Sequence, residues 1–207
     1  MWTYSNATQF TITGDWTNTY LKGLKIKWAD GTISSGYGYV LSSSFGAGVT
    51  TVTLIPSTSY ILHAGITAQY YSTANPSDFP GWLNYTPAGI SNTNVTLTGR
   101  FNIVNSTCHV QFKAVFTGAI TFTTMPSLPI VASSNIITYG GFIDIRGTGG
   151  YVDNGVNLYP MGIMPAVYAS NSVFYLCSSP NGTYITATTP ITWANLDCIV
   201  AQFSYEI

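Results

Sequence analysis

The segment VTLTGRFNIVNSTCHVQFKAVF, residues 95–116, decides the fold class of this chain. Asn105-Ser106 supplies a turn near its middle, and apolar residues recur at every second position along most of both arms. The alternating residues are Val95, Leu97, Phe101, Ile103, Cys108, Val110, Phe112, Ala114 and Phe116. Successive side chains of a strand point to opposite faces of a sheet, so the pattern predicts a β-hairpin with its apolar residues on one face.

Outward from this hairpin, the same period of two predicts strands through most of the chain. Toward the N-terminus it predicts four strands, at residues 9–13, 24–29, 37–41 and 51–55. Toward the C-terminus it predicts short strands at residues 120–124, 136–145, 156–159, 163–168, 173–178, 183–188 and 198–206. A helical stripe stays open as an alternative only at residues 60–70. Short strands at this spacing are typical of a sandwich or a jelly roll.

A stretch rich in proline and aromatic residues interrupts the alternation at residues 74–87. Its three prolines lack the backbone N–H that regular pairing needs, and Phe79, Trp82 and Tyr85 stand among them, which predicts a packed joint between domains. The sequence therefore predicts an all-β chain of two domains. Residues 1–87 would form a small β-barrel-like or β-sandwich domain, and residues 88–207 an antiparallel, jelly-roll-like β-sandwich.

Charged residues make up only 6% of the chain, whereas an ordinary soluble domain carries about 25%. Uncharged polar residues must then form most of the surface, which suits packing against copies of the chain or binding of neutral polar partners. The six Lys and Arg residues and the net charge of -1 argue against a nucleic-acid partner. No apolar stretch approaches the roughly 18 residues of a spanning helix, so we expect no membrane insertion.

The cysteines give no sign of a metal site. Cys108, Cys177 and Cys198 lie far apart and show no CxxC spacing. His109 follows Cys108 on a predicted strand, so the two side chains should point to opposite faces. We expect buried thiols instead. Because phosphate-binding and dinucleotide-binding motifs are also missing, we expect neither a metal nor a cofactor.

Short phrases in the first two fifths of the chain carry a resemblance. They are WTY at residues 2–4, FTITGD at 10–15, KGLKIKW at 22–28, GYGYV at 36–40, TVTL at 51–54 and PGWLNYTP at 80–87. In this order they resemble a module of tailed-bacteriophage virion proteins, found in tail fibres and related minor structural proteins. The second part resembles more loosely the β-sandwich tips that follow such modules, through Arg100-Phe101, Leu128-Pro129 and the closing residues 203–207.

The resemblance implies a homotrimeric projection on a virus particle that carries a host-contacting domain. It implies other virion structural proteins as partners, no cofactor and usually no catalysis. The protein would then be located in the virion, as a tail or capsid projection, after assembly in the host cytoplasm. A low charge fits such an assembly, because obligate interfaces are poor in ions and rich in apolar and aromatic area.

Loops of the second part supply the candidate ligand contacts. An aromatic ring can stack on the apolar side of a sugar while Asn and Asp bind its hydroxyl groups. Residues of these types lie in or near predicted loops, beside a glycine run at residues 147–150 that we expect to be a flexible loop. The candidates are Tyr151, Asp153, Asn154, Tyr159, Trp193 and Asn195. For each of them, packing or a subunit contact is the alternative.

Catalysis finds little support in the seven carboxylates. Asp15 and Asp30 stand in turn contexts, and Asp144 lies two residues from Arg146 on a predicted strand, which favours a surface ion pair.

We therefore predict a tail fibre or receptor-binding protein that is not an enzyme and contacts a host-surface polysaccharide. One alternative is a capsid-borne head fibre or decoration protein with an assembly role only. A second is a glycan depolymerase, which would need two carboxylates across one glycosidic bond.

Overall fold

The structure is a computed structural model that describes residues 1–74, 78–90, 93–120, 125–133, 138–139, 142–143, 146–155, 157–162, 173–174, 176, 185–186 and 188–207. Contacts divide the chain into two compact units, Met1–Asn84 and Tyr85–Ile207. Both are built from β-strands, which confirms the all-β prediction. Among the described residues, no helix is long and apolar enough to cross a membrane. The predicted domain bounds, 1–87 and 88–207, stay a prediction.

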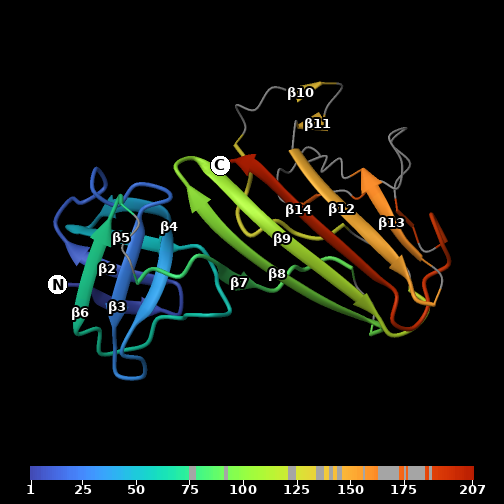
Figure 1. Ribbon diagram of the computed structural model, residues 1–207. Helices are drawn as coiled ribbons and strands as arrows, with labels where there is room; N and C mark the ends of the chain where they lie inside the picture. Colours follow the sequence, from blue (N-terminus) through green and yellow to red (C-terminus); the bar gives the residue numbers. More distant parts are fainter. Residues whose placement is uncertain are drawn as a thin grey trace. The chain divides into compact units, whose positions relative to one another are not determined.

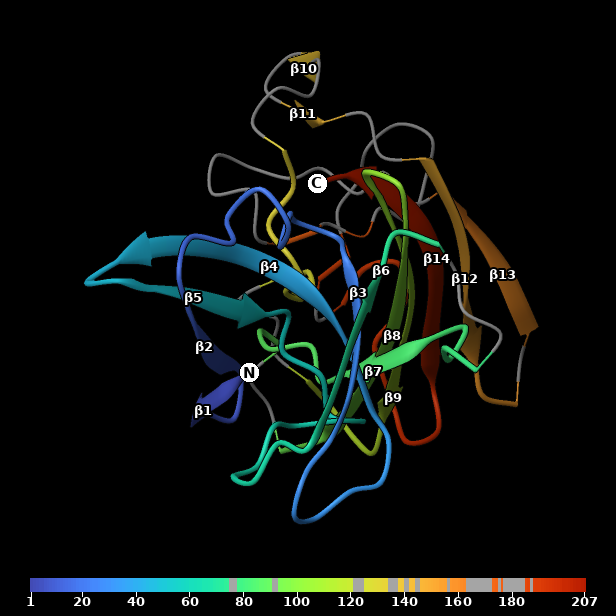
Figure 2. The same ribbon diagram turned by 90° about the vertical axis from the view of Figure 1, so that its left-hand side faces the viewer.

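The N-terminal unit contains one curved antiparallel sheet (Figure 1). Its strands are β1 (Thr3–Asn6), β2 (Gln9–Thr13), β3 (Lys25–Ala29), β4 (Gly36–Gly46), β5 (Val49–Leu54) and β6 (Ala68–Ser72). In space they follow the order β1-β2-β5-β4-β3-β6. The first part of β4 pairs with β3 and the second with β5, with an irregular register between Val40 and Ser42. Figure 2 shows β4 arching between these two partners, so the sheet curls into a half-barrel.

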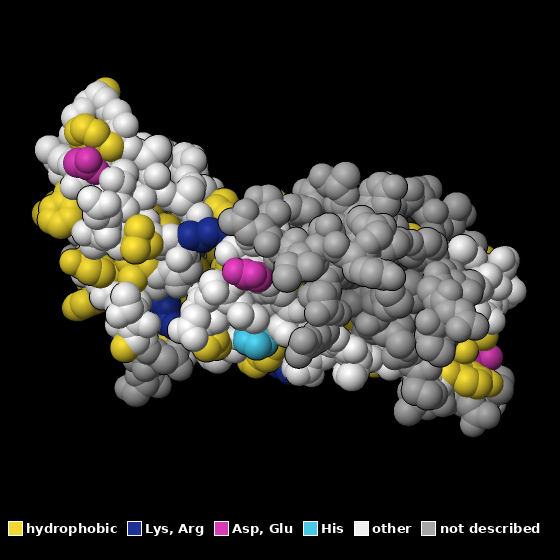
Figure 3. Space-filling view, turned by 90° about the horizontal axis from the view of Figure 1, so that it is seen from above, with side chains coloured by type: hydrophobic (Ala, Val, Ile, Leu, Met, Phe, Trp, Pro, Cys, Tyr) yellow, Lys and Arg dark blue, Asp and Glu magenta, His cyan; other side chains and the backbone are white. Residues whose placement is uncertain are grey.

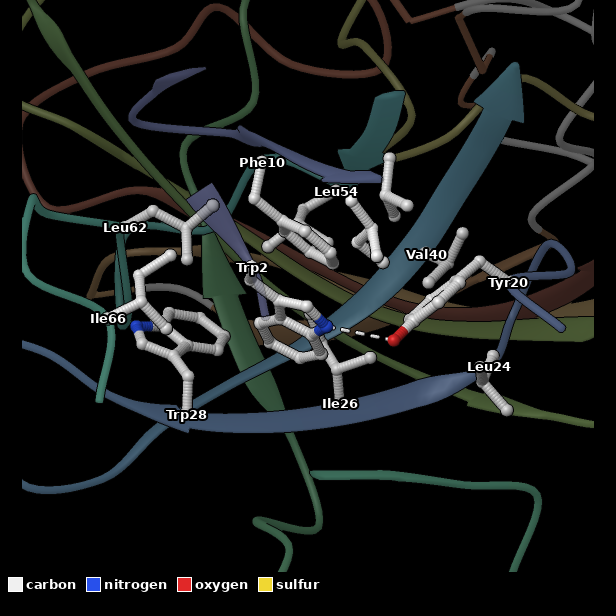
Figure 4. Packing of buried hydrophobic residues seen from close by; sticks show 12 residues of the cluster. Trp2, Phe10, Tyr20, Leu24, Ile26, Trp28, Val40, Leu54, Leu62 and Ile66 are labelled. Carbon is white, nitrogen blue, oxygen red and sulfur yellow. Dashed lines mark hydrogen bonds between the residues drawn. The ribbon is translucent and has the colours of Figure 1, made fainter. Parts of the chain in front are cut away.

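Aromatic and aliphatic side chains fill the inside of this curve (Figure 4). The Trp2 and Phe10 rings stack with their centroids 4.1 Å apart, and the Trp2 indole N–H donates to the Tyr20 hydroxyl at 2.8 Å. Phe10 and Trp28 are 0% and 1% exposed. Full burial of such rings stabilises the fold by roughly 1.5–3 kcal/mol each. The core of this unit comes from residues between Trp2 and Ile66.

The C-terminal unit is built on a second antiparallel sheet. Its strands are β7 (Leu83–Tyr85), β8 (Val95–Val104), β9 (Thr107–Phe116), β12 (Arg146–Asp153), β13 (Asn157–Gly162) and β14 (Cys198–Glu206). They follow the order β13-β12-β14-β9-β8-β7, and the chain passes from one unit to the other within β7. Two short strands, β10 (Thr138–Tyr139) and β11 (Phe142–Ile143), pair only with each other.

The predicted hairpin at residues 95–116 is confirmed by β8 and β9. Val104 pairs with Thr107, and Asn105 adopts a φ of 55° that turns the chain. Its apolar face is buried: Phe101, Val110 and Phe116 are each 0% exposed. This pairing makes the hairpin the centre of the second sheet.

Irregular segments cover the apolar face of the second sheet. Phe174 packs against Phe112 at 5.1 Å and against Phe203 at 4.7 Å, and Trp193 packs against Phe116 at 4.7 Å between ring centroids. Within the described residues this cover forms only isolated bridges near the predicted strands 173–178 and 183–188. The unit is thus sandwich-like, with one regular layer, and jelly-roll connectivity stays a prediction.

Two local expectations differ from the structure. The glycine run at residues 147–150, expected as a flexible loop, belongs to β12 between β13 and β14. A Cβ on Gly147 would lie 2.6 Å from the Phe203 Cβ atom, so glycine here serves close strand approach. Residues 60–67 form no helix, and β6 follows them. The predicted strand at 163–168 lies outside the described residues.

Candidate functional site

Polar side chains cover the outer side of the second sheet, which we call the open face. Four residues stand directly opposite one another on four adjacent strands and form a row across it: Arg100, Gln111, Gln202 and Thr148. All but Gln111 are exposed, and Gln111 is half-buried. Strand alternation explains the row, because Gln111 and Gln202 are each flanked by two buried apolar residues and Arg100 is followed by the buried Phe101.

Hydrogen bonds connect the row from strand to strand. The Arg100 Nε atom donates to the Gln111 Oε1 atom at 2.5 Å, and the Gln111 Nε2 atom donates to the Gln202 Oε1 atom at 3.2 Å. Each amide has further donor and acceptor capacity beyond these bonds. The row therefore offers a fixed set of hydrogen-bonding groups at the surface.

A hollow of about 390 Å³ lies beside this row on the same sheet. It is lined by His109, Gly147, Thr148, Gln202, Phe203 and Ser204. His109 pairs with Ser204 across β9 and β14, one step along the strands from Gln111 and Gln202. None of the described residues that line the hollow is a carboxylate. Its chemistry suits a neutral polar ligand with several hydroxyl groups.

The three aromatic residues among the predicted contacts lie on the other side of the sheet. The Tyr151 and Tyr159 rings stack at 4.9 Å, and the Trp193 ring meets Tyr151 edge-on at 5.9 Å. Trp193 is 1% exposed and donates its indole N–H to the Thr186 carbonyl at 2.8 Å. Burial raises the pKa of Tyr151, with smaller contributions from Tyr159 and Asp153. The Trp193 ring thus supports Tyr151 from inside and has no face to offer a ligand.

A buried carboxylate organises the loop that carries the other candidates. Asp197, 1% exposed, accepts hydrogen bonds from the backbone N–H of Asn154 at 2.9 Å and of Ala194 at 2.6 Å. Asn154 and Asn195 are exposed, and Asp153 is half-buried. Sequence reasoning missed Asp197, although an aspartate inside an Asn-Leu-Asp turn was the available signal.

Other carboxylates in the described residues also have structural partners. The Asp30 side chain has no exposed surface, and it accepts the indole N–H of Trp28 at 3.0 Å and the backbone N–H of Thr32 at 2.8 Å. Burial opposes its ionisation, but hydrogen bonds from Ile33, Thr32, His63 and Trp28 outweigh burial and lower the pKa of Asp30. The Asp15 carboxylate accepts hydrogen bonds from the backbone N–H and the hydroxyl of Thr17, and these bonds lower the pKa of Asp15. Asp144 lies outside the described residues.

The cysteine and aromatic predictions have mixed outcomes. Cys108 is buried, as predicted, whereas Cys198 is half-buried, and Cys177 lies outside the described residues.

Phe79 packs on Tyr37 at 5.6 Å inside the first unit, and Tyr85 packs on Phe101 at 5.9 Å inside the second. These two rings therefore serve different cores. Among the described residues, no group of three or more His, Cys, Asp or Glu could hold a metal ion.

No protein-family model, no curated protein and no solved structure matches the chain. The predicted resemblance to bacteriophage virion proteins therefore stays a prediction from the sequence.

Proposed function

We propose that this chain is a structural protein of a bacteriophage virion whose C-terminal unit binds a neutral host-surface glycan on the open face. The observation that carries this proposal is the row Arg100–Gln111–Gln202–Thr148, in which hydrogen bonds join the first three members, beside a hollow whose described lining residues include no carboxylate. Sugars present several hydroxyl groups to hydrogen-bond, and side-chain amides can both donate and accept. A preformed row loses little side-chain freedom on binding, which favours affinity.

The glycan proposal differs in its residues from the sequence prediction. Tyr151 and Trp193 are 8% and 1% exposed, so a sugar would meet amides and hydroxyl groups first. Asn154 and Asn195 remain exposed in loops as a second group, whereas the half-buried Tyr159 lies in β13. The open face is the better candidate because its polar groups sit on strands, which hold them more rigidly than loops do.

Assembly as a homotrimer is part of the proposal and has its own support. The first unit exposes large apolar side chains, among them Trp16 at 42%, Leu21 at 61% and Phe45 at 50%. Figure 3 shows, on the side that it draws, only isolated charged side chains among uncharged and apolar ones in the described part. Apolar, ion-poor surface is typical of subunit interfaces. Light scattering at micromolar concentration should show a trimer, and a stable monomer would contradict this part.

The test of glycan binding uses the full chain and polysaccharide isolated from host envelope. Gln202→Ala and Gln111→Ala should each weaken binding by about tenfold, since each removes hydrogen bonds that a bound sugar would use. Gln9→Ala is the matched control, because Gln9 is a strand amide of the first unit. Circular dichroism verifies that each variant is folded.

Outcomes of this test separate the alternatives. If saturating protein neither binds host envelope nor blocks phage adsorption, the assembly-only role of a head fibre or decoration protein replaces receptor binding. If incubation releases reducing ends from host polysaccharide, and Asp153→Asn abolishes the release, the chain is a depolymerase and the proposal of a non-catalytic protein fails.

A further inference from the structure

A groove on the outer face of the N-terminal sheet combines lysines with exposed aromatic rings. Its volume is about 220 Å³, and it lies over β3 and the edge strand β6. The lining residues that matter are Lys25, Lys27, Tyr70, Ser72, Asp78 and Phe79. None of them belongs to the open face of the second unit, so the groove calls for a separate explanation.

The strand register builds this groove. Lys25 stands directly opposite Tyr39 on β4 and Ser72 on β6, and Lys27 stands opposite Tyr70 on β6. Directly opposite residues project to the same side of a sheet, so both ammonium groups and the Tyr70 ring share the outer face. The inner side of the same strands carries Ile26 and Trp28, which lie in the core.

The two lysines differ in their partners. Lys27 forms an ion pair with Asp78, whose carboxylate also accepts the Tyr37 hydroxyl at 3.3 Å. The hydrogen bond between them raises the pKa of Lys27 and lowers that of Asp78. Lys25 has no carboxylate partner among the described residues. Its Nζ atom lies 5.9 Å from the ring centroid of Tyr39 and 5.9 Å from that of Phe79.

The groove therefore carries one uncompensated positive charge beside an exposed ring. Two lysines and one aspartate leave a net charge of +1 over its lining. Contacts of an ammonium group with aromatic faces are weak at exposed sites and leave its hydrogen bonds available to an anion. Tyr70 is 60% exposed, which leaves much of its ring open to a flat ligand.

We propose that this groove binds an acidic sugar residue, a pyranose that carries a carboxylate or phosphate group. The anionic group pairs with the Lys25 ammonium group, and the apolar side of the sugar ring stacks on Tyr70. Ligand pockets for drug-sized molecules have volumes of about 300–1,000 Å³, so a groove of about 220 Å³ fits a single sugar residue. A neutral sugar would leave the Lys25 charge uncompensated.

The experiment titrates the full chain with three small ligands at low salt: glucuronic acid, glucose 6-phosphate and glucose. Binding is followed by NMR chemical-shift changes or by calorimetry. At least one acidic sugar should bind saturably, and glucose should bind about tenfold more weakly or not at all. Added salt should weaken binding of the acidic sugar, because salt screens exposed charge pairs. The two acids distinguish a carboxylate from a phosphate as the preferred anion.

Variants locate the site. Lys25→Gln should weaken acidic-sugar binding at least tenfold, whereas Lys113→Gln, an exposed lysine of the second unit, should leave it unchanged. Tyr70→Ala should weaken binding by removing the stacking surface. Asp78→Asn should preserve or tighten binding, since it removes the negative charge nearest the groove. Thermal melts check that each variant is folded.

Three results would overturn the proposal: no saturable binding of either acid, equal binding of glucose and the acids, or equal affinity of Lys25→Gln and Lys113→Gln. The Gln202→Ala variant keeps the two proposals distinguishable. It should lose affinity for host polysaccharide on the open face and keep its affinity for the small acidic sugar.

Discussion

The two units solve the same problem, burying one face of a sheet, in different ways. The N-terminal sheet curls on itself, so its core comes from the sheet and its own short loops, within residues 2–66. The C-terminal sheet leaves one face open and covers the other with segments far away in the sequence, such as those of Phe174 and Trp193. A curved sheet buries its own inner face, whereas a flatter sheet needs a separate covering layer. The flatter solution leaves a broad polar face exposed.

The largest expected effect tests whether the two cores are separate. Trp28→Ala should destabilise the first unit by about 3–5 kcal/mol, and Phe112→Ala the second by a similar amount, because each leaves a large cavity. Hydrogen exchange read by mass spectrometry assigns the loss to peptides of each unit. Each substitution should lower protection in its own unit only. Loss of protection throughout the chain after either one would show a single cooperative structure.

The next effect concerns the buried carboxylate of the second unit. Asp197→Ala should destabilise that unit by about 2–3 kcal/mol, because it leaves the backbone N–H groups of Asn154 and Ala194 without their acceptor. Asp153→Ala is the control and should change stability by less than about 0.5 kcal/mol. Denaturant unfolding measures both. Equal effects would mean that Asp197 does not hold the loop.

The corresponding carboxylate of the first unit predicts a pH dependence. The pKa of Asp30 is lower in the folded chain than its ordinary value of 3.8, so the unfolded chain takes up this proton more readily. The stability from Asp30 is present above that value and is lost as the pH falls through the folded pKa. Asp30→Asn should lower the free energy of unfolding by about 1–2 kcal/mol at pH 7. It should also make that free energy less dependent on pH in the acidic range.

Unfolding of the first unit at pH 7, 4 and 2 measures the difference in the free energy of unfolding between wild type and Asp30→Asn. Wild type and Asp30→Asn should converge as the pH falls. A constant gap between them across the series would contradict the assignment of the acid sensitivity to Asp30.

The smallest expected effect lies on the surface of the first unit. Asp78→Asn breaks the exposed ion pair with Lys27 and should change the free energy of unfolding by less than about 1 kcal/mol. Thermal melts in low and high salt measure it, and the difference should shrink as salt screens the pair. A large decrease in the free energy of unfolding that does not depend on salt would show that Asp78 is needed for the fold. Asp78→Asn would then be unsuitable as a variant in the binding experiment.

Much of the fold could be predicted because it depends on local patterns. Phe10, Ile12, Ile26 and Trp28 alternate with polar residues, and each of them is buried. The glycine run at residues 147–150 shows where this reasoning ends. Glycine is typical of loops, but Gly147 lies in a strand. Its position holds glycine because Phe203 of β14 leaves no room for a side chain. That constraint comes from a residue more than 50 positions away.

The candidate sites depended even more on tertiary structure. Their residue types were visible, and alternation already places Lys25 and Lys27 on one face of a strand. The sequence predicts ligand contact for Tyr151 and Trp193, yet their rings pack against each other in the core. A sequence does not show which of its aromatic residues the core will use.

Alternation of apolar and polar residues by itself determined that this chain is all-β and that residues 95–116 form a hairpin, and the composition determined that the surface is poor in charge. Only the tertiary structure decided which polar residues meet. Arg100, Gln111, Gln202 and Thr148 come from four strands, and only the register aligns them. Local periodicity fixes the face on which a side chain lies. Pairing between distant strands fixes its neighbours, and a binding site is made of neighbours.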